Sequence, residues 1–457
     1  MLRIINPATE AVIDELDTDT PESVAEKFKV ARLAQKQWAE RPLQDRMAMI
    51  ERFGVILQER KDGLAKTLSS EMGKPVGQAI GEIGGVAPRV QYFLKQVPPF
   101  LDEVQVHSNQ NGSMRELLTY EPLGVIGNIS AWNYPFFVGA NVFLPALLTG
   151  NAVMYKPSEF AMLTGLGIAQ ALYDAGVPEE IFPTLIGGGE IGAALLEQDL
   201  GGVYFTGSHA TGVKVAQAAS KKLMRVQLEL GGKDPAYVCD DVDPKSAAQN
   251  VASGVFYNTG QSCCSIERVY VHEKLYDAFV EAFLEEVASF KMGDPMQDGI
   301  FIGPLTRDAQ RGVIQKQVDD ALAKGATLRC GGAKVDGTGY YYQPTVLTEV
   351  NGQMDVMREE SFGPIIGIEK VADDEAALAA MNDSRYGLTA SVFCQSEDRA
   401  RAMMAKLEAG SAYWNCCDRV SSNLPWTGWK DSGIGSTLGH DGIRAFLQPK
   451  GWHLRRP

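Results

Sequence analysis

The fold is decided by one stretch of the chain, GVIGNISAWNYPFFVGANVFLPALLTGNAVMYK, which covers residues 124–156. The short apolar runs at 124–129 and 152–156 are typical of buried strands, and the apolar segment 135–148 between them has the length of a helix. A strand, a helix and a second strand in this order form the repeating unit of a parallel sheet covered by helices. The stretch therefore predicts an α/β fold.

The same alternation extends in both directions from this unit. Helical patterns fill most of the first hundred residues, and strand–helix alternation starts again after Gly231-Gly232. Further strands are expected at 182–186, 202–206, 268–271, 365–371 and 390–394, and further helices at 161–175, 190–198, 210–219, 244–258 and 274–290. Two α/β lobes follow from this pattern. Two extended segments, about 107–122 and 446–457, are left over and are expected to pair as a small sheet, inside one subunit or between subunits.

The size and charge of the chain exclude several classes of protein. Its 457 residues are too many for one hydrophobic core, because such cores stop growing near ~250–300 residues. A formal net charge of −14 argues against a general affinity for nucleic acid or for an anionic membrane. No stretch approaches the ~18 consecutive apolar residues of a membrane helix, and the N-terminus lacks the pattern of a signal peptide. We therefore expect a cytoplasmic protein that binds neither nucleic acid nor membrane.

Cysteines and histidines are few. Seven cysteines in so long a chain form no disulfide framework, and five scattered histidines supply no good ligand set for zinc, so no metal site is expected. The adjacent thiols of Cys263 and Cys264 lie among glycine and small polar residues, where a ligand can approach the backbone. These residues allow a reactive thiol, although a small buried apolar residue is the commoner role of a cysteine.

Three other short patterns suggest chemistry, and each has a plain structural alternative. Glu229 lies in an apolar strand that ends at Gly-Gly; burial there raises a carboxyl pKa toward that of a general base, but a solvent-facing strand edge explains it equally. The turn FTGSHATG, residues 205–212, leads from a strand into a helix whose free N–H groups can hold a phosphate, although its glycine spacing is weak evidence. Asn133 can donate to an oxyanion, or it forms a turn before Pro135.

The order of the motifs is more specific than any one of them. The motifs are WNYP (132–135), GNAVMYKPSE (150–159), FTGSHATG (205–212), LELGGKDP (228–235), NTGQSC (258–263), EESFGP (359–364) and WKDSGIG (429–435). In this order they resemble the aldehyde dehydrogenase superfamily, NAD(P)-dependent and not CoA-acylating, over nearly the whole chain. The resemblance implies two doubly wound α/β lobes, a Rossmann-like cofactor lobe and a catalytic lobe, with a small β oligomerisation arm.

The resemblance also implies how the chain is divided and assembled. The NAD(P)-binding domain is expected at 1–106 and 123–229, the catalytic domain at 230–430, and the oligomerisation arm at 107–122 and 431–457. The implied assembly is a homodimer or a homotetramer.

Carried over position by position, the resemblance assigns three catalytic residues. Cys263 is the nucleophile, because the family's cysteine lies two residues after the Gln of its motif. The thiolate attacks an aldehyde to give a thiohemiacetal, whose oxyanion faces the Asn133 amide and the Cys263 N–H. Glu229 activates the water that hydrolyses the resulting thioester. Cys264 is then a neighbour in the pocket wall.

A dinucleotide cofactor is implied across the first lobe. The residues expected to contact it are Trp132, Lys156, Ser158, Glu159, Gly207, Ser208, Gly212, Leu230, Glu360 and Phe362. The carboxylate of Glu159 accepts hydrogen bonds from ribose hydroxyls and repels a 2′-phosphate, which favours NAD. Lys156 and Ser158 leave NADP possible.

Two positions depart from the family's pattern. Val142 stands where many relatives carry a Lys nine residues after the Asn of the first motif, and Thr437 stands where many carry a Glu. These two groups are proposed to relay protons from the deacylation site in relatives that have both. Losing one of the two charged residues alone would leave a partly buried charge unpaired, whereas losing both leaves no unpaired charge. We hypothesise that protons leave through Glu229 and water instead.

The aligned substrate pocket is largely apolar and aromatic, as small-molecule pockets tend to be. Its residues are Tyr134, Phe137, Val138, Tyr257, Ser262, Cys264, Val420 and Trp426. Succinate-semialdehyde-oxidising relatives often carry Arg at two positions that are Asn141 and Tyr257 here. The one nearby cation that could reverse this inference, Arg419, is expected to be a solvated loop residue. An uncharged aliphatic or aromatic aldehyde is therefore expected.

Three alternatives in function remain at this stage. A semialdehyde dehydrogenase is one, and a CoA-acylating enzyme is another, although Glu229 argues against it because such relatives usually lack that base. The third is a non-enzymatic use of the fold, which the joint retention of Cys263, Glu229 and Asn133 argues against.

Overall fold

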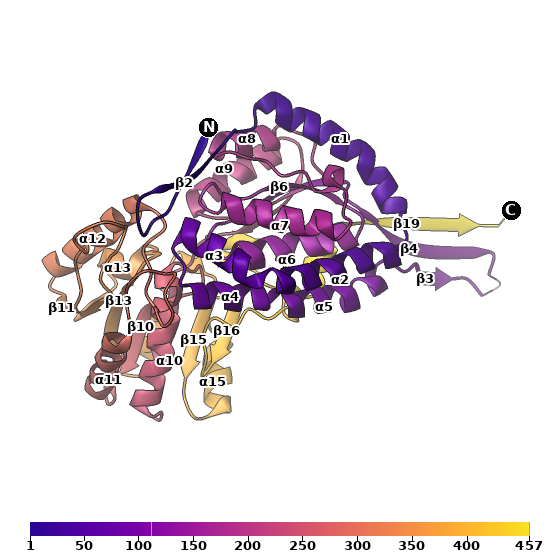
Figure 1. The fold of residues 1–457 in the computed structure, drawn as a ribbon. Coiled ribbons are helices and arrows are strands. Elements are labelled where there is room, and N and C mark those ends of the chain that lie inside the picture. Colours follow the sequence, from indigo (N-terminus) through magenta and orange to yellow (C-terminus); the bar gives the residue numbers. More distant parts are fainter. Residues whose placement is uncertain (111, 457) are drawn as a thin grey trace.

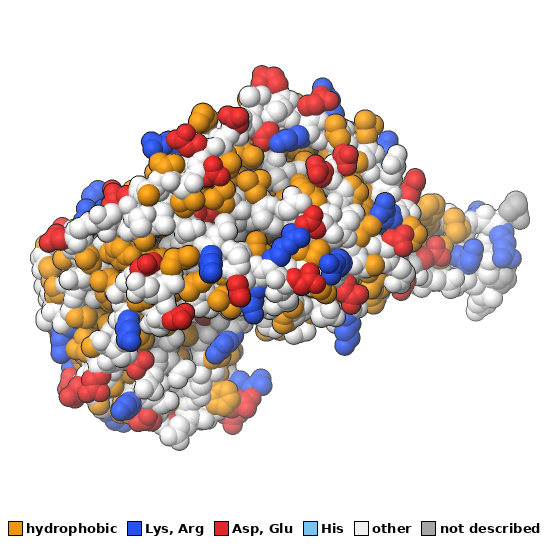
Figure 2. All heavy atoms as spheres, in the orientation of Figure 1, with side chains coloured by type: hydrophobic (Ala, Val, Ile, Leu, Met, Phe, Trp, Pro, Cys, Tyr) orange, Lys and Arg blue, Asp and Glu red, His pale blue; other side chains and the backbone are white. Residues whose placement is uncertain are grey.

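The computed structural model describes residues 1–110 and 112–456. Figure 1 shows two α/β lobes and a narrow arm that projects from one of them and carries the C-terminal strand. Acidic and basic side chains are interspersed over the face seen in Figure 2. The mixed α/β architecture with parallel sheets confirms the predicted fold class.

The first lobe is built on a five-stranded sheet in the order β18-β8-β7-β5-β6. Four strands are parallel, and the short β18 pairs antiparallel with β8 at one edge. The strands are β5 Val125–Ile129, β6 Ala152–Lys156, β7 Gly202–Thr206, β8 Arg225–Glu229 and β18 Gly433–Ile434. Almost every residue of β5, β6 and β7 is buried, which explains their continuous apolar runs.

Helices surround this sheet and supply most of the first lobe's core. They are α1 Pro21–Glu40, α2 Leu43–Glu59, α3 Lys61–Met72, α4 Val76–Gly84, α5 Val86–Gln96, α6 Pro135–Leu148, α7 Met162–Asp174, α8 Gly189–Leu196 and α9 His209–Ser220. Helix α1 begins with a capping box between Thr20 and Ser23, and α6 begins at Pro135, whose fixed φ suits the first helical position. Smaller elements complete the lobe: η1 Pro98–Phe100, η2 Glu179–Ile181, and the hairpin of β1 Leu2–Ile5 with β2 Val12–Leu16.

The prediction of a strand at 182–186 was wrong, because the structure has only an isolated bridge there. The segment runs beside β6 but forms only a single bridge, between Tyr155 and Thr184. The Tyr155 N–H donates to the Pro183 carbonyl at 2.9 Å, and the Leu185 N–H donates to the Tyr155 carbonyl at 2.8 Å. Since Pro183 has no N–H to donate, the ladder cannot extend there.

The second lobe is built on a seven-stranded sheet in the order β11-β12-β13-β10-β9-β15-β16. All its pairs are parallel except β11 with β12. The strands are β9 Asp234–Val238, β10 Ile266–His272, β11 Thr327–Cys330, β12 Thr345–Thr348, β13 Ile365–Val371, β15 Thr389–Phe393 and β16 Ser411–Trp414. The helices are α10 Pro244–Phe256, η3 Tyr257–Gly260, α11 Tyr276–Ser289, α12 Asp308–Ala323, α13 Asp355–Arg358, α14 Asp374–Asn382 and α15 Glu397–Met404, and a small pair joins β14 Tyr386–Gly387 to β17 Trp429–Lys430.

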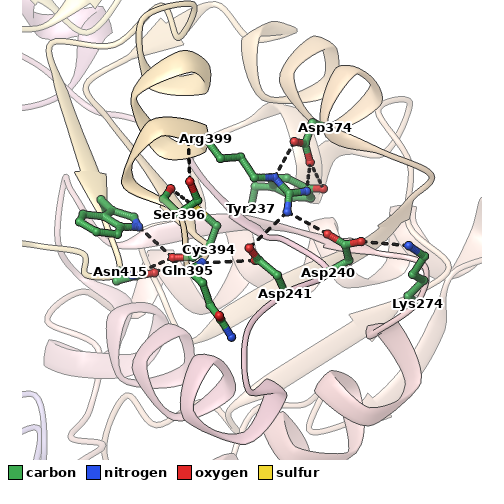
Figure 3. A network of polar contacts seen from close by, with 11 residues as sticks. Tyr237, Asp240, Asp241, Lys274, Asp374, Cys394, Gln395, Ser396, Arg399 and Asn415 are labelled. Carbon is green, nitrogen blue, oxygen red and sulfur yellow. Dashed lines mark hydrogen bonds and ion pairs between the residues drawn. The ribbon is translucent and has the colours of Figure 1, made fainter.

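Helices on both faces of this sheet produce two separate cores. Alternate residues of β9 and the residue that follows it show the division, because Ala236 and Val238 belong to one core and Tyr237 and Cys239 to the other. At one end of the sheet Arg399 of α15 donates to Asp374 of α14 at 2.7 Å and to Asp240 after β9 at 2.8 Å (Figure 3). This network joins helices to strand ends of the second lobe away from the cavity described below.

The arm is a three-stranded antiparallel sheet in the order β19-β4-β3 (Figure 1). Its strands are β3 Val104–Ser108, β4 Met114–Pro122 and β19 Leu447–Arg455. The two extended segments of the sequence therefore do pair within one chain. Residues 111 and 457 of the predicted arm lie outside the described residues. Among the described helices none is long and apolar enough to cross a membrane.

Residues 431–446 belong to the first lobe in their packing. Leu438, Ile443 and Phe446 are fully buried in its core. Leu438 precedes α16 Gly439–Arg444, Ile443 lies within it and Phe446 follows it. Within the expected arm segment 431–457, β19 is the element that pairs in the arm sheet. The division into cofactor, catalytic and arm domains remains a prediction about units of function.

Candidate active site

One cavity of about 730 Å³ lies at the carboxyl ends of the parallel strands of the first lobe. It is lined by Ile129 at the end of β5, Lys156 at the end of β6, Thr206 at the end of β7 and Glu229 at the end of β8. Ligands of open α/β sheets bind at this edge, because loops of varied sequence follow each strand there. The predicted catalytic and cofactor residues that line this cavity are Asn133, Trp132, Lys156, Ser158, Glu159, Gly207, Ser208, Glu229, Leu230, Cys263, Glu360 and Phe362.

Gly212 is the predicted cofactor residue that does not line the cavity. It lies within α9, and a Cβ there would come within 2.5 Å of Leu230 Cδ2. Its lack of a side chain therefore lets α9 pack against the segment after β8.

Cys263 follows a tight loop that begins with η3. Asn258 and Thr259 have φ values of 49° and 57° in the left-handed region, and a Cβ on Gly260 would lie 2.3 Å from the Gly363 carbonyl. The side chain of Gln261 fixes the loop, since its Oε1 accepts from the Thr306 N–H at 2.9 Å. These constraints hold Cys263 at the cavity wall.

The electrostatics separate the two adjacent thiols. A hydrogen bond from Cys264 favours the Cys263 thiolate, but burial and the charge of Glu229 outweigh it, so the pKa of Cys263 is raised. The hydrogen bond to Cys263 and burial raise the pKa of Cys264 well above its ordinary value. The single S–H of Cys264 can donate instead to Asp418 Oδ1 at 3.0 Å, and the thiol stays protonated in either arrangement. A cation bound near Cys263 would be needed to lower its pKa.

Asn133 is buried at the loop between β5 and α6. Its Oδ1 accepts from the Tyr134 N–H at 3.1 Å. Within the part of the chain that the structure describes, its Nδ2 donates to no protein acceptor and remains available to an oxyanion in the cavity.

A buried ion pair, which the sequence analysis missed, supports this loop. Lys74 lies between α3 and α4 and pairs with Glu82 of α4, and both side chains are fully buried. Lys74 Nζ donates to the Asn133 carbonyl at 2.6 Å and lies 3.5 Å from the Tyr134 ring centre. Glu82 Oε1 accepts from the Phe136 N–H at 2.9 Å, in the first turn of α6. Burial lowers the pKa of Lys74 and raises that of Glu82, and each charge offsets the other shift.

Glu229 is buried at the end of β8. Its Oε1 accepts a hydrogen bond from Trp426 Nε1, and its Oε2 accepts from Thr206 Oγ1 at 3.4 Å. Burial raises the pKa of Glu229 to about 7, although both donors and the charge of Arg89 act against this rise. A carboxyl group with this pKa suits general base catalysis near neutral pH.

The two departures from the family pattern are fully buried and uncharged. Val142 is a buried residue of α6, and the Thr437 hydroxyl has no hydrogen-bond partner among the described residues. A cation nevertheless acts on Glu229 from another element, because the charge of Arg89 on α5 lowers the pKa of Glu229. The Arg89 guanidinium carbon lies 3.8 Å from the Phe137 ring centre. Arg89 Nε donates to Asn141 Oδ1 at 3.1 Å. No sequence pattern had indicated this arginine.

The cavity fits a dinucleotide. Helix α9 begins at its edge, and Ser208 caps that helix by accepting from the Thr211 N–H, so a phosphate there would meet the positive end of the helix dipole. Lys156 Nζ lies 3.2 Å from the Glu159 carboxylate, which is partly exposed. At the other end, Glu360 Oε1 accepts from the Gly232 N–H at 3.2 Å, and Gly231 leaves room for this carboxylate. The helix N-terminus and the two carboxylates suit phosphate and ribose hydroxyl groups respectively.

The predicted substrate residues do not line this cavity but form a neighbouring aromatic cluster. Tyr134 stacks on Phe137 with ring centres 6.0 Å apart, and Tyr257 lies 6.3 Å from Tyr134. The Tyr257 hydroxyl donates to Ser262 Oγ at 2.6 Å, which links the cluster to the Cys263 loop. Val138 and Trp426 are buried, and Val420 packs on the first core. Asp418 adds a partly buried carboxyl group beside Cys264, and desolvation raises its pKa; sequence reasoning missed this residue.

Comparison with known proteins agrees with this geometry. Residues 1–451 match the Aldehyde dehydrogenase family. The chain belongs to this family. A betaine aldehyde dehydrogenase of Brucella anthropi is 34% identical over 453 residues, which cover 98% of this chain and 92% of that protein.

Two solved aldehyde dehydrogenase structures are similar over most of their length. The lactaldehyde dehydrogenase of Escherichia coli has a TM-score of 0.95 and 33% identity, covering 99% of this chain and 95% of that one. The NAD-dependent aldehyde dehydrogenase of Sinorhizobium meliloti has a TM-score of 0.96 and 32% identity, covering 100% and 92%. This aldehyde dehydrogenase therefore has the fold and the family that its motifs indicated.

Replacing Lys74 tests whether the buried ion pair supports Asn133. Lys74→Met leaves Glu82 as an uncompensated buried carboxylate, and we expect it to lower the free energy of unfolding by about 3–5 kcal/mol and to lower kcat. Urea denaturation and steady-state kinetics measure the two effects.

The double variant Lys74→Met/Glu82→Leu is the control. It removes both charges, so most of the stability should return. The kcat should stay low, because the Asn133 carbonyl still lacks the short bond from Lys74 and keeps only the 3.4 Å bond from Asn258 Nδ2. Full recovery of kcat in the double variant would contradict a role for Lys74 in placing Asn133.

Proposed function

We propose that this aldehyde dehydrogenase converts an aldehyde to its carboxylic acid through a covalent bond to Cys263, with Asn133 as oxyanion donor and Glu229 as base. The observation that carries the proposal is the meeting of these three side chains in the wall of one cavity, whose far end suits a dinucleotide. The family membership supports the reaction type, and the geometry supports the individual roles.

The first half of the reaction is addition to the carbonyl. The Cys263 sulfur attacks the aldehyde carbon, and the carbonyl oxygen of the thiohemiacetal meets the Asn133 amide and the Cys263 N–H. One such donor is typically worth ~3–4 kcal/mol of transition-state stabilisation. Bound NAD⁺ would be held by residues such as Lys156, Ser208 and Glu360, and it would supply a hydride acceptor at this site.

The second half is hydrolysis of the thioester. Glu229 takes a proton from water as the water oxygen attacks the acyl carbon, and the bond to the Cys263 sulfur breaks. Because Val142 and Thr437 carry no charge, the proton leaves Glu229 through water and not through a charged relay. A CoA-acylating reaction is disfavoured, since it does not need a buried base that activates water.

NAD is the proposed cofactor in preference to NADP. The Glu159 carboxylate at the end of the cavity accepts hydrogen bonds from ribose hydroxyls and repels a 2′-phosphate. Its ion pair with Lys156 lowers the positive charge that would attract that phosphate. The Sinorhizobium meliloti relative, which is NAD-dependent by name, supports this preference.

The proposed substrate is an aldehyde without negative charge, in first place an uncharged aliphatic or aromatic one. The carboxyl group of Asp418 lies partly buried beside the aromatic cluster, and Arg89 already donates to Asn141 and to the Gly85 carbonyl. A cationic aldehyde is the second candidate, because a carboxylate beside aromatic rings favours an ammonium group. The betaine aldehyde dehydrogenase among the relatives supports this candidate.

The arm supports assembly into a homodimer or a homotetramer. Its outer strands β3 and β19 leave unpaired edges and expose Val104, Val106, Trp452 and Leu454. Exposed strand edges with apolar side chains pair readily with another chain. We propose that a second copy covers them, and that the assembly works in the cytoplasm.

Two variants test the catalytic roles. Cys263→Ala should abolish aldehyde-dependent NADH production, because no thioester can form. Glu229→Gln should keep a rapid first turnover but slow the following ones by about 10²–10⁴-fold, because only hydrolysis needs the base. Stopped-flow absorbance of NADH separates the two phases, and full steady-state turnover of Cys263→Ala would refute the proposal.

The pH dependence of turnover follows from the environment of Glu229. Its pKa is raised to about 7 by burial, so the carboxyl group is mostly protonated, and inactive as a base, below that pH. With hydrolysis rate-limiting, kcat should fall about tenfold per pH unit below pH 7 and level off above it. Steady-state kcat measured across this range checks the prediction, and a flat profile through neutral pH would contradict it.

A panel of aldehydes tests the substrate class. Hexanal, benzaldehyde and betaine aldehyde should each show a higher kcat/KM than succinate semialdehyde, because Asp418 repels a carboxylate. Asp418→Asn should reduce any preference for betaine aldehyde over hexanal by about tenfold, while Asp441→Asn on the exposed face of α16 serves as the matched control. A much higher kcat/KM for succinate semialdehyde would exclude the proposed class.

A further inference from the structure

We propose that Trp426 is a positioning residue for the base: its indole N–H holds the Glu229 carboxylate in place and keeps it ionised, in a chain whose two relay positions carry no charge. The inference rests on the proposed role of Glu229 in hydrolysis and adds to it a specific partner. Trp426 acts through Glu229, not on the reacting atoms.

The carboxylate of Glu229 is held from two sides by neutral donors. Trp426 Nε1 donates to Oε1, and both side chains are almost completely buried. Thr206 at the end of β7 donates to Oε2 at 3.4 Å, a longer and weaker bond. The indole is therefore the main donor to this carboxylate among the described residues.

The backbone fixes Trp426 itself. The Trp426 N–H donates to the Thr437 carbonyl at 2.6 Å, and the Thr437 N–H donates back to the Trp426 carbonyl at 2.9 Å. The indole also packs in the core of the first lobe. Thr437 stands where many relatives carry the acidic member of the relay. Here the same segment holds the tryptophan that contacts the base.

The charged and titratable groups facing Glu229 are few. Arg89 of α5 favours its ionised form, and the thiol of Cys263 faces it across the cavity wall. Arg89 already donates to Asn141 and to the Gly85 carbonyl. Val142 contributes no charge from α6. A neutral donor in direct contact therefore carries a large share of what keeps the buried carboxylate ionised.

This contact matters at the hydrolytic step. Water adds to the acyl carbon and passes one proton to Glu229, the bond to the Cys263 sulfur breaks, and the thiolate and the carboxylic acid are formed. The proton then leaves Glu229 to solvent water. An indole N–H binds a carboxylate more strongly than a neutral carboxyl group, so it restores the base between turnovers.

Trp426→Phe tests the inference, because it keeps an aromatic ring and removes the donor. We expect the apparent pKa that governs the acid limb of kcat to rise by about one unit, which corresponds to about 1.4 kcal/mol. Turnover should then fall about tenfold below neutral pH and recover at alkaline pH, while the rapid first turnover of NADH is unchanged. A uniform loss at every pH, with no shift of the limb, would overturn the inference.

Two further variants guard against a purely structural effect. Benzothienylalanine at position 426 has the shape of tryptophan without the N–H, and it should reproduce the pH shift even if phenylalanine disturbs the fold. Trp414→Phe removes a comparable indole bond, to the Cys394 carbonyl at 2.9 Å in the second lobe, and should leave the limb in place. An unshifted limb in the benzothienylalanine variant, or an equal shift in Trp414→Phe, would refute the inference.

Glu229→Gln separates this inference from the proposed function. If Glu229→Gln retains full steady-state turnover, the base is misassigned and both proposals fail. If Glu229→Gln is slow in hydrolysis but Trp426→Phe keeps the wild-type pH limb, only the role of Trp426 fails.

Discussion

The parallel register of strands β5 to β8 is the constraint on which the active site depends. Parallel pairing brings all four carboxyl ends to one edge, with Ile129 opposite Lys156 and Phe205, and Thr206 opposite Glu229. Thr206 can donate to Glu229 only because the two are register partners. A shift by one residue would turn each of these side chains to the other face of the sheet. The position of the cavity is therefore determined by the pairing of the strands, and the loops add to it.

Buried charge is concentrated around this edge. Lys74, Glu82, Arg89 and Glu229 all lie in the first lobe with little exposure to water. Burying such groups is costly unless each meets a partner, and each here has one or more. The buried charges lower the stability of the fold. The partners that reduce this cost also determine where the side chains of Asn133 and Glu229 point.

Most of the fold could be predicted from the sequence, because the buried strands and helices are visible as local patterns of apolar residues. The strands β5, β6 and β7 are buried apolar runs, and α6 fills the interval between two of them, so pattern and structure coincide. The strand predicted at 182–186 was wrong. The segment is apolar like a buried strand, but Pro183 has no N–H to donate to β6, so only one bridge forms. The motif positions placed Cys263, Asn133 and Glu229 near one another only through a family resemblance. The contacts of Lys74, Arg89, Asp418 and Trp426 arise from packing between distant segments, which no local pattern records.

The edge strand β18 affects the order in which the parts of the first lobe can fold during synthesis. Gly433 pairs with Glu229, and the Leu230 N–H donates to the Ser432 carbonyl at 3.0 Å. The strand β8, which carries the proposed base Glu229, is thus paired by residues synthesised about two hundred positions later, after the whole second lobe. During translation the first lobe can collapse around its helices, but its sheet lacks the edge strand β18 until residues 433–434 have been synthesised. The nascent chain therefore stays unable to turn over aldehyde until both lobes and the C-terminal segment are in place.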